Sequence, residues 1–136
     1  MAVVLKLIDH SGVPIKGESE VPNHVDEIDV QTWSWGVTSP AGVKFNMLNM
    51  SIRKAFDLAS PKILSATATR ETLQGVLTVI DQQGNDSLTA TLKTTTVESV
   101  NIGEQQYPPA EEISLRFDSI ELSYKAENVI LTRPAP

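Results

Sequence analysis

The histidines are the first residues in this chain of 136 amino acids whose chemistry could define a site. His24 is followed closely by Asp26 and Glu27, and this combination of nitrogen and oxygen donors can bind Zn²⁺. No further ligand is indicated nearby, and so sparse a set seldom forms a metal site. His10 lies in an expected turn. A solvated loop explains His24 and its neighbours with fewer assumptions, so we expect no metal and no cofactor.

A second acidic cluster surrounds Gly84 and consists of Asp81, Asn85 and Asp86. A calcium loop needs alternating acidic ligands and a terminal glutamate, and the spacing here provides neither. The turn of a β-hairpin accounts for the same residues.

Catalytic groups are equally scarce. The chain has no cysteine, which excludes disulfides, thiolate metal sites and cysteine nucleophiles. Acidic residues are plentiful, but the sequence marks no pair of them as buried, and general acid–base catalysis needs the shifted pKa values that burial creates. A serine nucleophile requires a histidine close to it, and no histidine is predicted to lie near Ser34. We therefore expect a protein that is not an enzyme.

The charge balance limits the choice of partners. Eleven basic residues face 17 acidic ones, giving a net charge of −6 and a pI near 4.8. Nucleic acid and anionic membranes are therefore not expected partners. The opening run MAVVLKLIDHSG is too short and too polar for a signal peptide or a membrane span, so we expect synthesis in the cytoplasm.

Apolar residues alternate with period two along most of the chain, which predicts a mainly β fold. One single domain is expected over residues 1–136, with 127–136 as a flexible tail or a docking arm. Ser60 and Pro61 favour a helix start, and a short helix is expected from Pro61 to Thr69. The expected strands cover residues 3–8, 27–37, 43–55, 73–80, 86–100 and 111–126.

The last long strand contains a change of phase. Its apolar positions are odd-numbered as far as Phe117 and even-numbered from Ile120 onward. Since a slip of one residue sends every side chain to the opposite face, a straight strand cannot bury both sets. The pattern predicts a β-bulge or a sharp bend at Asp118–Ser119.

Two tryptophans share one face of the second strand. Trp33 and Trp35 are expected to pack into the core, because large aromatic side chains dominate core burial. Strand alternation then turns Ser34 to the opposite, outer face.

Five strings follow one another along the chain: KGES at 16–19, TWSWGV at 32–37, MSIRKAFDLASPKILSATAT at 50–69, TLKTTTVESV at 91–100 and EEISLRFDSIELSYKA at 111–126. In this order they resemble the haemolysin-coregulated protein (Hcp) family of type VI secretion. The most specific feature is SWG followed by a D-x-x-S-P helix start. The sequence departs from the family at Leu58 and Arg70, where lysine and glycine are common.

The resemblance implies a β-barrel of two packed antiparallel sheets with one short flanking α-helix. It further implies a homo-hexameric ring with a wide channel, ring-on-ring stacking into a tube, and export through the secretion machine. Sheath, spike and effector proteins are the implied partners, with effectors carried in the lumen. Ser34 would then face the lumen and contact cargo.

Three alternatives remain open. Tail-tube proteins of phages and of other contractile injection systems share the expected fold. A monomeric barrel that binds a small ligand would need an internal cavity, whereas the apolar strand faces predict a filled core. A hydrolase on a β scaffold is the third.

Overall fold

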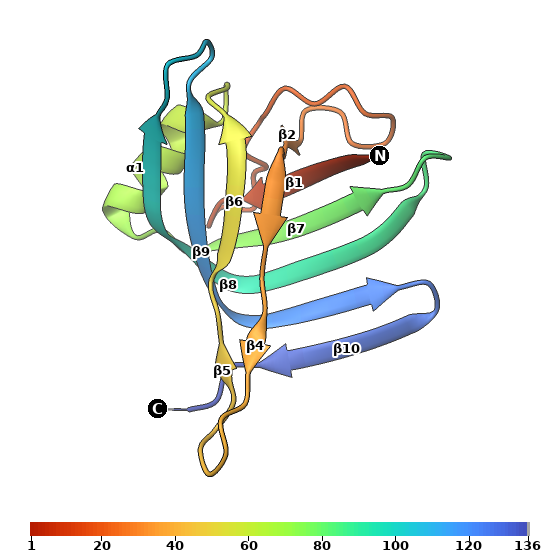
Figure 1. Ribbon diagram of the computed structural model, residues 1–136. Helices are drawn as coiled ribbons and strands as arrows, with labels where there is room; N and C mark the ends of the chain where they lie inside the picture. Colours follow the sequence, from red (N-terminus) through yellow and green to blue (C-terminus); the bar gives the residue numbers. More distant parts are fainter. Residues whose placement is uncertain (136) are drawn as a thin grey trace.

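A computed structural model describes residues 1–135 as one large curled sheet, one helix and a small protruding hairpin (Figure 1). The elements are β1 (Ala2–Ile8), β2 (Ile28–Asp29), β3 (Thr32–Ser34), β4 (Val37–Thr38), β5 (Asn46–Met47), β6 (Met50–Ala55), α1 (Ser60–Thr69), β7 (Leu73–Ile80), β8 (Asp86–Gly103), β9 (Ala110–Tyr124) and β10 (Glu127–Thr132).

The predicted fold class is confirmed: the chain is mainly β, antiparallel, and has one flanking helix. The large sheet has the strand order β2-β1-β7-β8-β9-β6-β3, and β10 pairs with the C-terminal half of β9. Its two halves are continuous through β8 and β9, which curl the sheet into a half-barrel (Figure 1). The small sheet contains only β4 and β5.

The bend predicted near Asp118 is present and is shared by two strands. Phe117 and Ile120 are both buried in the core although three positions separate them. On β8, Leu92 and Thr95 are buried with the same separation, and Thr94 between them has a φ of 53°. The pairs on either side of Thr94 keep one register, so both strands change phase at the same place.

Two long strands predicted from alternation are each interrupted. Residues 27–37 form β2, β3 and the start of β4, and residues 43–55 form β5 and β6. The interruption occurs where the chain leaves the large sheet to build the hairpin. There the Trp35 indole donates to the Leu48 carbonyl oxygen at 2.8 Å, and the Leu48 backbone N–H donates to the Gly36 carbonyl oxygen at 3.1 Å.

The helix forms as predicted, but Ser60 is not its N-cap. Ala59 occupies that position, without a side-chain cap. The Ser60 hydroxyl is buried instead and contacts Lys54 and Glu111 beneath the helix. Within the segment 127–136, expected to be a tail or a docking arm, Glu127–Thr132 form the regular strand β10, and residue 136 lies outside the described residues.

Candidate functional site

Four serines form a continuous row across the face of the sheet turned away from α1. Ser34 on β3 pairs with Ser51 on β6, which pairs with Ser114 on β9, which pairs with Ser99 on β8. Residues directly opposite on neighbouring strands have their Cβ atoms about 5 Å apart, so the four hydroxyls lie side by side. We call this set the serine row.

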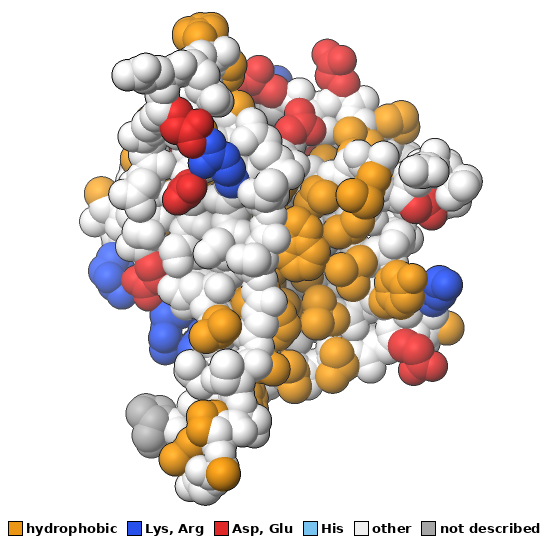
Figure 2. Space-filling model, in the orientation of Figure 1, with side chains coloured by type: hydrophobic (Ala, Val, Ile, Leu, Met, Phe, Trp, Pro, Cys, Tyr) orange, Lys and Arg blue, Asp and Glu red, His pale blue; other side chains and the backbone are white. Residues whose placement is uncertain are grey.

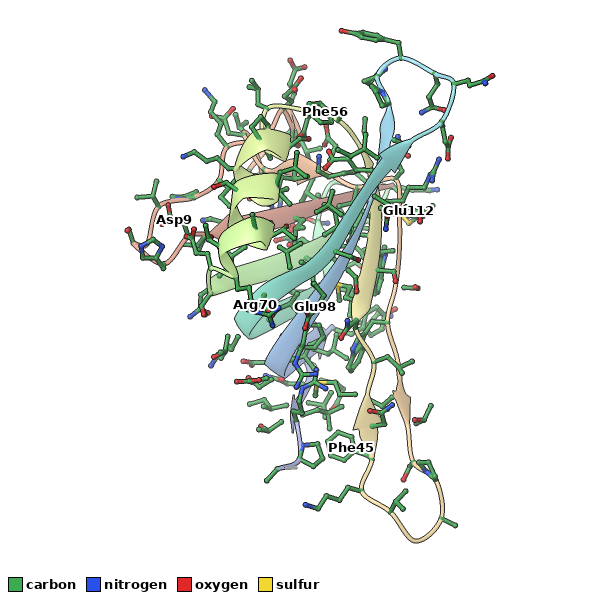
Figure 3. The ribbon with its side chains drawn as sticks, turned by 90° about the vertical axis from the view of Figure 1, so that its left-hand side faces the viewer. Asp9, Phe45, Phe56, Arg70, Glu98 and Glu112 are labelled. Atoms are coloured by element: carbon green, nitrogen blue, oxygen red, sulfur yellow. The ribbon has the colours of Figure 1, made fainter. Side chains whose placement is uncertain are left out.

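A second row of polar residues lies beside the serine row, in the order Thr32, Arg53, Glu112, Asn101. Arg53 donates to Glu112 at 3.1 Å and also pairs with Glu104. The hydrogen bond that Arg53 donates to Glu104 is the main reason that the pKa of Arg53 is raised. Glu112 projects on the side of the sheet opposite to α1 (Figure 3).

Together the two rows form the polar wall, which surrounds a shallow depression of about 510 Å³. Its side chains are short and mostly uncharged, and its single cation is offset by two carboxylates. Such a surface offers many hydrogen-bond donors and acceptors and little net charge. It can contact a polar partner at many points without binding it tightly at any one of them.

A β-bulge brings Ser99 onto this wall. The pairing of β8 with β9 shifts by one residue between Val97 and Ser99, leaving Glu98 as the extra residue. Before the shift Val97 is buried, and after it Ser99 and Asn101 line the depression. The bulge thus re-aims one end of β8 so that two polar side chains face outward.

The expected orientation of the tryptophan strand is confirmed. Trp33 and Trp35 are partly buried against the core, and the Trp35 ring lies 6.0 Å from that of Phe117. Ser34 between them is exposed on the polar wall. Sequence reasoning found Ser34 but missed Ser51, Ser99 and Ser114. Each serine lies on the outer face of an alternating strand, but only the strand order brings the four together.

The other sequence candidates have structural partners. His24 is nearly buried, with Nδ1 3.0 Å from Glu27 and Nε2 2.8 Å from Asp86. Asp81 accepts backbone hydrogen bonds from Gln83 and Asn85 and so closes the predicted hairpin turn. Within residues 1–135, no three His, Asp or Glu side chains are arranged to hold a metal ion. No helix in that range is long and apolar enough to cross a membrane.

The concave face of the half-barrel leaves apolar side chains uncovered at one end. Val79, Leu88 and Tyr124 are successive cross-strand neighbours there, and Leu122 pairs with Val129 in the next row. Tyr124 is 50% exposed and Val129 47%. Figure 2 shows apolar side chains gathered over this part of the sheet. We call these five residues the open apolar patch.

A curled sheet with a polar wall on one face and an open apolar patch on the other is typical of a subunit of a protein assembly. The chain belongs to the Hcp family: the family described as "Type VI secretion system effector, Hcp" matches residues 5–124. This family provides the tube proteins of type VI secretion.

Known relatives agree with this assignment. Protein hcp1 of Pseudomonas aeruginosa is 28% identical over 128 residues, covering 83% of this chain and 79% of that protein. The structure of Hcp1 from E. coli EAEC 042 superposes with a TM-score of 0.88 at 25% identity, over 96% of both chains. A type VI secretion effector from Yersinia pestis gives 0.79 at 23% identity, over 96% of this chain and 99% of that one, and supports the fold.

Proposed function

We propose that this chain assembles into a homo-hexameric ring, that rings stack into a tube, and that the polar wall lines the channel. The observation that carries the proposal is the two-sided character of the sheet. One face is built from short polar side chains around Ser34, and the other ends in the open apolar patch. A monomer would leave that patch in water, whereas a neighbouring subunit would bury it.

Ring geometry also suits an asymmetric pair of contacts. In a closed ring each subunit presents one surface to the neighbour ahead and a different surface to the neighbour behind. The open apolar patch would supply one of these surfaces. The protruding β4–β5 hairpin, against which the segment after β10 lies, would supply part of the other.

In this assembly Ser34 and the rest of the serine row contact effector cargo in the lumen. Sheath and spike proteins of the secretion machine are the further partners. The chain would leave the cell through the machine. Its role would be structural, with no reaction catalysed.

Light scattering coupled to size-exclusion chromatography tests the ring, with negative-stain electron microscopy on the same fractions. We expect the mass of a hexamer and annular particles with an open centre. A monomeric mass at every protein concentration, without annular particles, would reject the proposal.

A tail-tube role in another contractile injection system is the second candidate. The anti-feeding prophage baseplate contains a chain that superposes with a TM-score of 0.57 at 11% identity, over 90% of this chain and 92% of that one. The likeness concerns the fold alone and is weaker than that to Hcp structures. Co-purification with type VI sheath components rather than with those of a phage tail would separate the two.

A further inference from the structure

The C-terminal segment Arg133–Ala135 lies against the bend of the large sheet. The backbone N–H of Arg133 donates to the Asp118 carbonyl oxygen at 2.7 Å. Its guanidinium donates to the Phe117 carbonyl oxygen through Nη2 at 2.8 Å and through Nε at 3.1 Å. These bonds satisfy backbone acceptors at the place where β9 changes phase.

The same side chain reaches the protruding hairpin formed by β4 and β5. Arg133 Nη1 donates to the Met47 carbonyl oxygen at 3.2 Å. At the other end of the segment, Lys44 Nζ donates to the Ala135 carbonyl oxygen at 2.8 Å. Phe45 points from the hairpin toward the C-terminal segment (Figure 3). The segment therefore touches the sheet and the hairpin at once.

The hairpin needs such support. Only Val37–Met47 and Thr38–Asn46 pair between its strands, and an isolated two-stranded hairpin is at best marginally stable in water. Arg133 is also an unusual choice for a packing residue. Within residues 1–135, no carboxylate lies at ion-pair distance from the guanidinium of Arg133. The Arg133 side chain is also partly buried. All three nitrogens of the Arg133 guanidinium donate to backbone carbonyl oxygens, so this side chain acts by fixing the relative positions of the segments that it joins.

We infer that Arg133–Ala135 is a clamp that fixes the direction of the β4–β5 hairpin relative to the sheet, with Arg133 as its positioning residue. The hairpin carries the exposed apolar side chains Val37, Val43 and Leu48 away from the body. A held hairpin presents them in one orientation, which lowers the entropic cost of contact with a second copy of the chain. A second copy is the occupant because this same chain leaves its open apolar patch uncovered. This last step rests on the proposed function.

Hydrogen–deuterium exchange on the full-length protein, diluted to its monomeric state, tests the clamp directly. Arg133→Ala should accelerate exchange of the peptide covering residues 36–48 about tenfold, because bonds from a charged donor are lost. Peptides from β7 should exchange as in the unchanged protein. Arg133→Lys should accelerate the exchange of residues 36–48 less than Arg133→Ala does. One ammonium cannot donate to the Phe117 and Met47 carbonyl oxygens together, as the guanidinium does.

Arg116→Ala is the matched control: it removes the same charge from an exposed position next to Phe117. It should leave residues 36–48 unaffected. Hairpin exchange in Arg133→Ala that equals that of the unchanged protein overturns the inference. If Arg133→Ala unfolds throughout, Lys44→Ala decides, because Lys44 is exposed. Lys44→Ala should then accelerate exchange roughly twofold to threefold, in residues 36–48 alone. An unchanged exchange rate in these residues overturns the clamp.

A second readout concerns assembly and is separable from the first. In electron micrographs at high protein concentration, Arg133→Ala should form fewer rings than the unchanged protein. Absence of rings from the unchanged protein would reject the ring proposal while leaving the exchange result to decide on the clamp. Rings formed by Arg133→Ala in the same proportion as by the unchanged protein would overturn the role of the clamp in assembly.

Discussion

The ammonium of Lys54 lies 2.7 Å from the carboxylate of Glu111, and both side chains are completely buried. Asp57 and Ser60 also contact the ammonium, at 2.8 and 3.1 Å, so the start of α1 is attached to β6 and β9 through one charged cluster. Glu111 Oε1 has no hydrogen-bond partner among the described residues. The pair is therefore incompletely compensated, and its geometry depends on both partners.

Removal of Glu111 alone should destabilise the protein more than replacement of both Lys54 and Glu111 by apolar residues. Glu111→Gln removes the completely buried one of the two carboxylates that pair with Lys54, leaving only Asp57, and should lower the free energy of unfolding by about 3 kcal/mol. Lys54→Met combined with Glu111→Leu should cost less than Glu111→Gln alone. Urea denaturation of these two variants and of the unchanged protein checks this, and a double variant less stable than the single one would contradict it.

Stability should depend on pH through His24. Burial is the largest influence on its pKa and lowers it, but the hydrogen bonds to Asp86 and Glu27 together raise the pKa above the ordinary 6.5. The stabilisation is therefore fully present below pH 6.5 and is lost as the pH rises through the higher folded-state pKa. His24→Gln should flatten the fall in stability measured by denaturant titration above pH 6.5.

His10→Gln is the control for this measurement. The hydrogen bond to Glu71 raises the pKa of His10 as well, but this histidine is exposed, so solvent screens the pair. Its replacement should change the pH profile little. Equal flattening by both replacements would show that the nearly buried position of His24 is unimportant.

Ser34→Arg should reduce cargo retention without harming the fold. Ser34 is exposed on the polar wall, and exposed substitutions of this kind usually change stability by less than about 0.5 kcal/mol. A long charged side chain would project over the serine row and obstruct a partner seated there. Pull-down of effectors with the variant ring measures the effect.

Ser65→Arg on the exposed side of α1 introduces the same side chain away from the polar wall. It should retain cargo like the unchanged ring. Retention by Ser34→Arg at the level of Ser65→Arg would remove Ser34 from the cargo surface.

Val129→Asp should weaken ring formation through the open apolar patch. A carboxylate at this half-exposed position would lose its water on contact with a neighbouring subunit. Ile130→Asp is the matched control, since Ile130 is the next residue of β10, faces the other side and is 63% exposed. Light scattering should find a lower fraction of rings for Val129→Asp, and an equal loss for both would contradict the choice of face.

Thr94→Gly should be neutral or stabilising, by up to about 1 kcal/mol. Thr94 has a φ of 53°, a left-handed conformation that costs a β-branched residue about 1–2 kcal/mol and costs glycine nothing comparable. The gain is offset in part by the greater freedom of glycine in the unfolded chain. Thr95→Gly, at a buried neighbouring position, should destabilise the protein in the same thermal melts.

The alternation of apolar residues within a segment correctly predicted those strands whose two faces keep the same surroundings from one end to the other. The strand expected over residues 73–80 is β7 with the same bounds, and the phase change at Phe117 and Ile120 correctly located the bend. Both patterns lie within one segment, so they are visible without knowledge of the strand order.

Features that depend on distant partners were not predictable in this way. Lys54 and Glu111 are 57 positions apart, and nothing in either segment indicates a buried charge. The break between Met47 and Met50 arises because the chain passes from the small sheet to the large one, although alternation suggests a single strand. The serine row likewise exists only once β3, β6, β9 and β8 are neighbours.

The bend at Thr94 and Asp118 also has a mechanical consequence. The strands β8 and β9 bend at the same cross-strand position and keep their register there. The two halves of the sheet are therefore continuous across the bend. A push on one half is transmitted to the other through two covalent backbones and the hydrogen bonds between them. A sandwich of two separate sheets would transmit it by sliding contacts between side chains. A subunit bent in this way resists shear across its core, which suits a subunit of the proposed tube.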